Sequence, residues 1–177
     1  MPFTFQDLDE TTREYMAQEI TLASSAGNLY FSRRFTAQGK EEWPRLLLKA
    51  ALDRDEHWLA YQLETQGLMT GLENSRTPSG GYTVKHVPHT AAETIAEGQF
   101  NRYYILGLCA RAVAEGIARV RVYRAKPVAN ARPESAALIG TGFDPSSLAA
   151  QIRPVEASLR HELLKPNSGL SVQIVSE

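Results

Sequence analysis

Arginine and tyrosine side chains gather in one short segment of this sequence and just beyond it. The residues that could bind an anion are Arg119, Arg121, Tyr123, Arg124, Lys126 and Arg132. Guanidinium groups form paired hydrogen bonds with phosphate or carboxylate, and a tyrosine between them can stack on a base or hold a phosphate oxygen. The segment therefore predicts a surface that binds a nucleic acid or another phosphorylated ligand. The alternative is a solvated strand face whose arginines pair with some of the 20 acidic residues or protect a sheet edge.

A second row of polar residues precedes this segment, on a helix that the apolar pattern predicts. Glu97, Asn101 and Tyr104 are spaced so that they follow one side of a helix, with Arg102 rotated off that line. As an enzyme site on an anionic substrate, the row would use Glu97 as acid or base, with Arg102 and Tyr104 orienting charge. A polar strip that hydrogen-bonds a neighbouring loop explains the row equally well, because buried polar groups need partners. Asn101 fits such a loop anchor.

Other motifs with known chemistry are weak in this sequence. His86 and His89 are spaced as two metal ligands, but Pro88 lies between them and no third ligand can be placed, so the sequence predicts a loop and no metal. Residues 140–142 read Gly-Thr-Gly, which can bring backbone amides close to a phosphate, but they lack the lysine and the spacing of a P-loop. Cys109 sits in an apolar run that disfavours a reactive thiolate. We expect no cofactor.

Length and composition predict one domain over residues 1–177. A 177-residue chain with 43% hydrophobic residues can bury a single core. The net charge of −1 gives no overall field that would attract nucleic acid or anionic membrane, so any anion binding must be local. No run of 18 apolar residues occurs, we expect no signal peptide, and the single cysteine excludes a disulfide within the chain. These features predict a cytoplasmic protein with no membrane partner.

The N-terminal half has helical periodicity. Its first helix is predicted over residues 7–26, with Thr4 and Asp7 at its start, followed by a short strand or extended connector over residues 29–32. A second helix is predicted after Gly39, with Pro44 in its first turn, and a third is predicted to begin at Asp53 or Asp55. This half should pack as a group of helices.

The second half alternates between helices and strands. A hairpin is predicted between residues 67 and 88, and Thr90 with Glu93 forms a capping box that should begin a buried central helix. Strands are predicted over residues 117–126 and 169–175, with a helix after Asp144 and another over residues 155–164. Gly107 and Gly98 within the central helix suggest a close neighbour at each point. Together these elements predict an α+β domain with a helical N-terminal half and a central helix packed on a small mixed sheet.

Three blocks of the sequence resemble an uncharacterised bacterial protein family. They cover residues 92–112, residues 122–126 with 132–135, and residues 166–170, which places the resemblance mainly in the C-terminal half. It implies that the polar blocks form one surface, and it brings no activity, ligand or catalytic residue with it. A third hypothesis, besides a binding module and an enzyme, is a structural protein that uses this face to form a homo-oligomer, consistent with a near-neutral chain that lacks an active-site motif.

Overall fold

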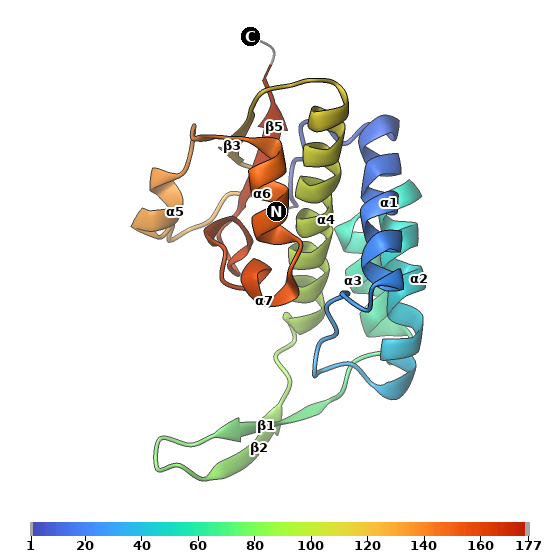
Figure 1. The fold of residues 1–177 in the computed structure, drawn as a ribbon. Helices are drawn as coiled ribbons and strands as arrows, with labels where there is room; N and C mark the ends of the chain where they lie inside the picture. The colour runs from blue at the N-terminus through green and yellow to red at the C-terminus, as the bar shows by residue number, and fades with distance from the viewer. Residues whose placement is uncertain (1, 176–177) are drawn as a thin grey trace.

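The longest helix, α4 (Ala91–Ala114), runs through the middle of the molecule, and helices and strands surround it (Figure 1). The computed structural model describes residues 2–175. Every residue of α4 from Gln99 to Cys109 is buried, in agreement with the apolar character of that stretch. Helices α1 (Glu10–Ser25) and α3 (Glu56–Thr65) pack on α4, as does α6 (Pro145–Ile152). The predicted α+β fold with a buried central helix is confirmed.

The three N-terminal helices form one side of the core. Helix α2 (Ala37–Asp53) lies against α1 and α3, as Figure 1 shows. Its buried face and those of its neighbours bring together Met16, Ile20, Trp43, Leu46, Leu47, Leu59 and Leu63. Burial of these aliphatic and aromatic groups is the main stabilising term for this half.

Several predicted boundaries in this half are wrong. Helix α1 begins at Glu10, because the side chain of Asp9, and not that of Asp7 or Thr4, accepts a hydrogen bond from the amide of Thr12 at 2.9 Å. Helix α2 begins before Gly39, so Pro44 lies inside the helix and not in its first turn. Residues 29–32 form no strand, which leaves the connector of the two predicted alternatives. Asp55 caps α3, as one of the two predicted alternatives.

A two-stranded hairpin projects from the body of the molecule (Figure 1). Strand β1 (Leu72–Arg76) pairs antiparallel with β2 (Tyr82–His86), and all five residues of β2 are exposed. The hairpin prediction is confirmed.

The second sheet lies beside α4 and has β3 (Val120–Arg124) at its centre. Strand β4 (Gly142–Phe143) pairs with one edge of β3 and β5 (Leu170–Ile174) with the other, both antiparallel, so the sheet is not mixed as predicted. Three short elements, α5 (Pro133–Ala137), α7 (Val155–Ser158) and the 3-10 helix η1 (Glu162–Leu164), connect these strands with α6. The helix predicted over residues 155–164 is therefore broken in two. Asp144 caps α6 as predicted, since its side chain accepts from the amide of Ser147 at 2.8 Å.

The two glycines of α4 differ in their surroundings. A Cβ atom on Gly107 would lie 2.7 Å from Cγ of Met16, so the close approach predicted there is confirmed. Around Gly98 no atom lies within 4 Å of such a Cβ position, and the prediction of a close neighbour is wrong. The capping box is also wrong, because Thr90 makes no side-chain capping hydrogen bond, although α4 does begin directly after it.

None of the helices within residues 2–175 has the length and apolar character needed to cross a membrane.

Candidate functional site

Asn101 joins α4 to the outer edge of β5. Its Nδ2 donates to the carbonyl of Leu170 at 2.9 Å, and its Oδ1 accepts from the hydroxyl of Ser171 at 2.7 Å. The side-chain amide of Asn101 therefore acts both as a hydrogen-bond donor and as an acceptor within the protein. The geometry fits the anchor interpretation of Asn101, not a role in holding a ligand.

Arg102 is a buried cation that holds the end of α6. Only 1% of the residue is exposed, and its guanidinium donates to the carbonyls of Ile152 at 3.3 Å and Arg153 at 2.5 Å. A positive group is favourable at a helix C-terminus, where backbone carbonyls lack partners and the dipole is negative. Burial lowers the pKa of Arg102. Arg102 is therefore directed into the protein and away from any ligand in solvent.

The two tyrosines of the predicted site hold the N-terminal segment. The hydroxyl of Tyr104 accepts from the amide of Asp7 at 3.2 Å. That of Tyr123 donates to the carbonyl of Thr4 at 2.7 Å and accepts from the amide of Gln6 at 3.1 Å. Burial raises the pKa of both phenols, that of Tyr123 to about 12. Both hydroxyl groups are thus occupied by the backbone of residues 4–7.

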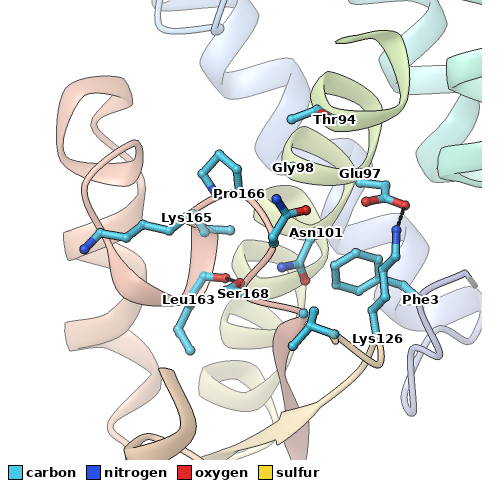
Figure 2. A pocket seen from close by; sticks show the side chains of 14 residues that line it. Phe3, Thr94, Glu97, Gly98, Asn101, Lys126, Leu163, Lys165, Pro166 and Ser168 are labelled. Carbon is cyan, nitrogen blue, oxygen red and sulfur yellow. Dashed lines mark hydrogen bonds and ion pairs between the residues drawn. The ribbon is translucent and has the colours of Figure 1, made fainter. Parts of the chain in front are cut away.

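Glu97 lies in a small pocket beside the first half of α4, which Figure 2 shows from close by. Its carboxylate forms an ion pair with Lys126, the dashed contact in Figure 2, and Glu93 lies 3.6 Å from the same ammonium group. Burial raises the pKa of the Glu97 carboxyl, and the Lys126 charge opposes the rise. The opposite wall of the pocket is the segment of residues 163–169.

The pocket around Glu97 is small and its polar groups are bound internally. Its volume is about 70 Å³, whereas pockets for drug-sized ligands span roughly 300–1,000 Å³. Ser168 in its wall donates to the carbonyl of Leu163 at 2.8 Å, and Glu97 is engaged with Lys126. Gly169 comes so close to the backbone of Lys126 that a Cβ atom would lie 2.2 Å from its carbonyl oxygen. The pocket is a small gap in the closely packed junction between α4 and the loop before β5.

Two arginines of the predicted surface also serve the loop before β5. Arg124 donates to the carbonyl of Ser168 at 2.7 Å, and Arg132 donates to the carbonyl of Pro166 at 3.3 Å. In the β3–β5 register Arg124 is opposite the buried Leu170, while Arg121 is opposite Gln173. Because side chains alternate along a strand, Arg124 and Arg121 lie on opposite faces of the sheet.

Arg119 and Arg121 remain, and they lie together at an open groove. Both residues are exposed. The groove has a volume of about 490 Å³ and is lined by Gly116, Ile117, Ala118, Arg119, Arg121, Gly140, Gly142, Ile174 and Val175. A Cβ atom on Gly142 would be 3.2 Å from Cδ of Arg119, so the glycine lets the arginine side chain lie against β4. The guanidinium of Arg119 reaches the carbonyl of Gly142 at 3.4 Å.

The two arginines at this groove form no ion pair within residues 2–175. No carboxylate in that part of the chain lies within ion-pairing distance, 4.0 Å, of Arg119 or Arg121. Asp144 is near enough to respond to Arg119, but its carboxylate accepts from Ser147, which is the main cause of its lowered pKa. The groove is therefore a local positive site on a chain with a net charge of −1.

The structure divides the predicted site residues into separate groups. Arg119 and Arg121 share the groove at the sheet. Glu97, Asn101 and Lys126 share the small junction, while Arg102 caps α6. Sequence reasoning did not identify the walls of the groove. The signal was present in part, because Gly-Thr-Gly at residues 140–142 supplies two of its glycines.

Neither metal nor known relatives add information about the site. Within residues 2–175, no group of three His, Cys, Asp or Glu side chains is placed to hold a metal ion. His86 ends β2 and His89 follows it in the connection to α4. Comparisons of the chain with protein-family models, with curated proteins and with solved structures found no match. The resemblance to an uncharacterised bacterial family stays a prediction, and function must be argued from geometry.

Proposed function

We propose that the protein binds a phosphorylated ligand through Arg119 and Arg121. One observation carries the proposal: two exposed guanidinium groups, with no carboxylate partner in residues 2–175, border a groove of about 490 Å³. That volume lies within the usual range for small-molecule pockets. Paired arginines are the side chains best suited to the planar, multidentate recognition of phosphate.

The remaining walls of the groove favour binding over catalysis. Ile117, Ile174 and Val175 offer an aliphatic surface for the less polar part of a ligand, such as a base or a ring. Among the lining residues there is no carboxylic acid, histidine, cysteine or hydroxyl side chain. A general base or nucleophile is therefore missing from the groove walls in the described part of the chain. Glu97, the predicted acid or base, is paired with Lys126 elsewhere.

Fluorescence polarisation with labelled mononucleotide, single-stranded and double-stranded DNA tests the proposal. We expect binding that weakens as salt rises from low to moderate concentration, because phosphate contacts release counterions. Arg121→Glu should weaken binding by about tenfold or more, since it places a like charge beside the phosphate. Arg160→Glu makes the same charge change at an exposed position away from the groove and should preserve binding. Salt-independent binding, or equal loss in both variants, would contradict the proposal.

The ligand size separates two forms of the proposal. A groove that holds one phosphate and one base should bind the mononucleotide as tightly as an oligonucleotide that ends in the same nucleotide and phosphate. A longer nucleic acid would gain affinity only by contacts beyond the two arginines, and its salt dependence would be steeper. The slope of affinity against salt for each probe therefore gives the number of phosphates bound.

A further inference from the structure

The hairpin of β1 and β2 has no core of its own. Its strands contact each other extensively and no other helix or strand to a comparable extent. At its base Arg34 pairs with Glu73 at 2.7 Å, with Lys85 3.9 Å from the same carboxylate. An isolated two-stranded hairpin is only marginally stable in water. The projecting ribbon therefore has much to gain from pairing with a further strand.

The outer edge of β2 offers backbone groups for such pairing. The amide of Val87 donates to the carbonyl of Gly71, and the amide of Thr77 donates to that of Gly81. Hydrogen-bonded pairs alternate along an antiparallel ladder, so Thr83 and Lys85 also direct their backbone groups toward β1. The amides and carbonyls of Tyr82, Val84 and His86 consequently point to the outer edge. No strand within residues 2–175 pairs with that edge.

We propose that two copies of this chain pair through their β2 edges, antiparallel, about a twofold axis at Val84. An antiparallel pairing of identical edges is self-complementary, as a twofold interface requires. With Val84 opposite its counterpart, Tyr82 lies opposite His86 of the other copy, and all three residues present outward backbone groups. Two hairpins then form one continuous four-stranded sheet.

The side chains of β2 support this register over its neighbours. Lys85 falls opposite Thr83 of the other copy, so its positive charge meets no like charge. A register centred on Lys85 would place two ammonium groups face to face, which is destabilising. Centring on Thr83 would engage the outward groups of Tyr82 and Val84 but leave those of His86 unpaired.

Exposure and strand propensity also favour β2 over β1 as the pairing edge. Tyr82 is 76% exposed and Val84 is 62% exposed, and both side chains lie on the same face of the hairpin. Tyrosine, threonine and valine favour strands, whereas the Glu-Asn-Ser run of β1 does not. Edge strands that do not pair commonly carry several charges or a proline, and β2 has one lysine. The surface is separate from the arginine groove, so the two proposals can fail independently.

Light scattering coupled to gel filtration of the full chain, over a range of concentrations, tests this pairing. We expect a particle of twice the monomer mass that dissociates on dilution. Val84→Lys should give a monomer, because two ammonium groups would meet at the axis. Asn74→Lys is the matched control. Asn74 is the β1 partner of Val84, so this variant adds the same positive charge one strand away from the axis. It should keep the dimer.

A cross-link fixes the register. Opposed positions in an antiparallel pair lie about 4.5–5.5 Å apart between Cα atoms, which is within the range of a disulfide. Val84→Cys should therefore form a covalent dimer under mild oxidation, whereas Lys85→Cys should not, and the buried Cys109 should not react. A wild-type monomer at every concentration would overturn the proposal. So would a dimer that survives Val84→Lys, or one that Asn74→Lys and Val84→Lys disrupt equally.

Discussion

Cationic side chains occupy two different environments in this protein. Around α4 and the loop before β5, Arg102, Arg124 and Arg132 donate to backbone carbonyls, and Lys126 pairs with Glu97. At the sheet groove, Arg119 and Arg121 are exposed and have no carboxylate partner in residues 2–175. The first group holds the fold together, and only the second is available to a ligand.

The difference comes from what the neighbouring backbone needs. Carbonyls at the end of a helix or in a tight loop lack backbone partners, and an arginine fork can satisfy two of them at once. Ile152 and Arg153 end α6 in this way, and Arg102 is the donor that reaches both. At the groove beside β3, the carbonyl of Gly142 accepts one hydrogen bond from Arg119 at 3.4 Å, and Arg121 makes no side-chain hydrogen bond within residues 2–175. Its arginines are thus left with donors to spare.

Loss of Arg102 should have the largest effect on stability. Arg102→Ala removes the donor to the Ile152 carbonyl and one of the two donors to the Arg153 carbonyl, whose other donor is Nδ2 of Asn28, and it opens a cavity, so we expect the free energy of unfolding to fall by about 3 kcal/mol. Urea denaturation followed by circular dichroism measures this loss. Arg160→Ala, at an exposed arginine, should change the value by less than about 0.5 kcal/mol. If both variants unfold alike, Arg102 does not hold α6 as its contacts indicate.

The glycines of α4 test whether the interior is tightly packed along the whole helix. Gly107→Ala places a methyl group 2.7 Å from Met16, so overpacking should cost about 1–3 kcal/mol. Gly98→Ala meets no atom within 4 Å and should be neutral or stabilising by up to about 1 kcal/mol, because alanine favours helices. Thermal unfolding of the two variants gives the comparison directly. Equal effects would mean that α1 can move away from α4.

Sequence reasoning located most elements because periodicity reports which side of an element is buried. The hairpin, the central helix and the strands around Val120 and Val172 were all predictable in this way. Capping was less predictable. Several polar residues near a helix start can serve as the cap, and tertiary contacts select one, as Asp9 rather than Asp7 shows. A pattern along the chain does not contain that choice.

The candidate site was harder to predict because it depends on distant partners. Tyr123 lies between arginines in the sequence, yet its hydroxyl is bound by Thr4, 119 positions away. Arg124 follows it and donates to a carbonyl 44 positions away. Alternation in β3 does separate Arg121 from Arg124, so the sequence predicts the two faces. It does not predict which face a loop covers.

Acid should weaken the interior around His161. Burial lowers the pKa of His161, whose Nδ1 accepts from the amide of Leu163 at 3.4 Å in the segment before β5. As the pH falls, the unfolded chain takes up a proton on this histidine at a higher pH than the folded protein does. The contribution of the neutral His161 to stability is therefore complete above the ordinary pKa of 6.5 and is lost as the pH falls through the lowered pKa. His161→Asn keeps an acceptor and should flatten the decline, as denaturation at several pH values would show. Identical pH profiles would contradict this assignment.

Substitution of Arg119 and Arg121 should change the stability of the protein least and its ligand affinity most. Arg119→Gln with Arg121→Gln removes two exposed charges that hold no buried backbone group, so each substitution should alter the free energy of unfolding by less than about 0.5 kcal/mol. Binding of a labelled mononucleotide should nevertheless fall sharply, because glutamine cannot supply the charge or the fork that phosphate recognition uses. Denaturation and polarisation on the same samples separate the two quantities. A large loss of stability would mean that these arginines are structural groups, like Arg102. The distinction between the two environments would then fail, because the groove would have no cation available to a ligand.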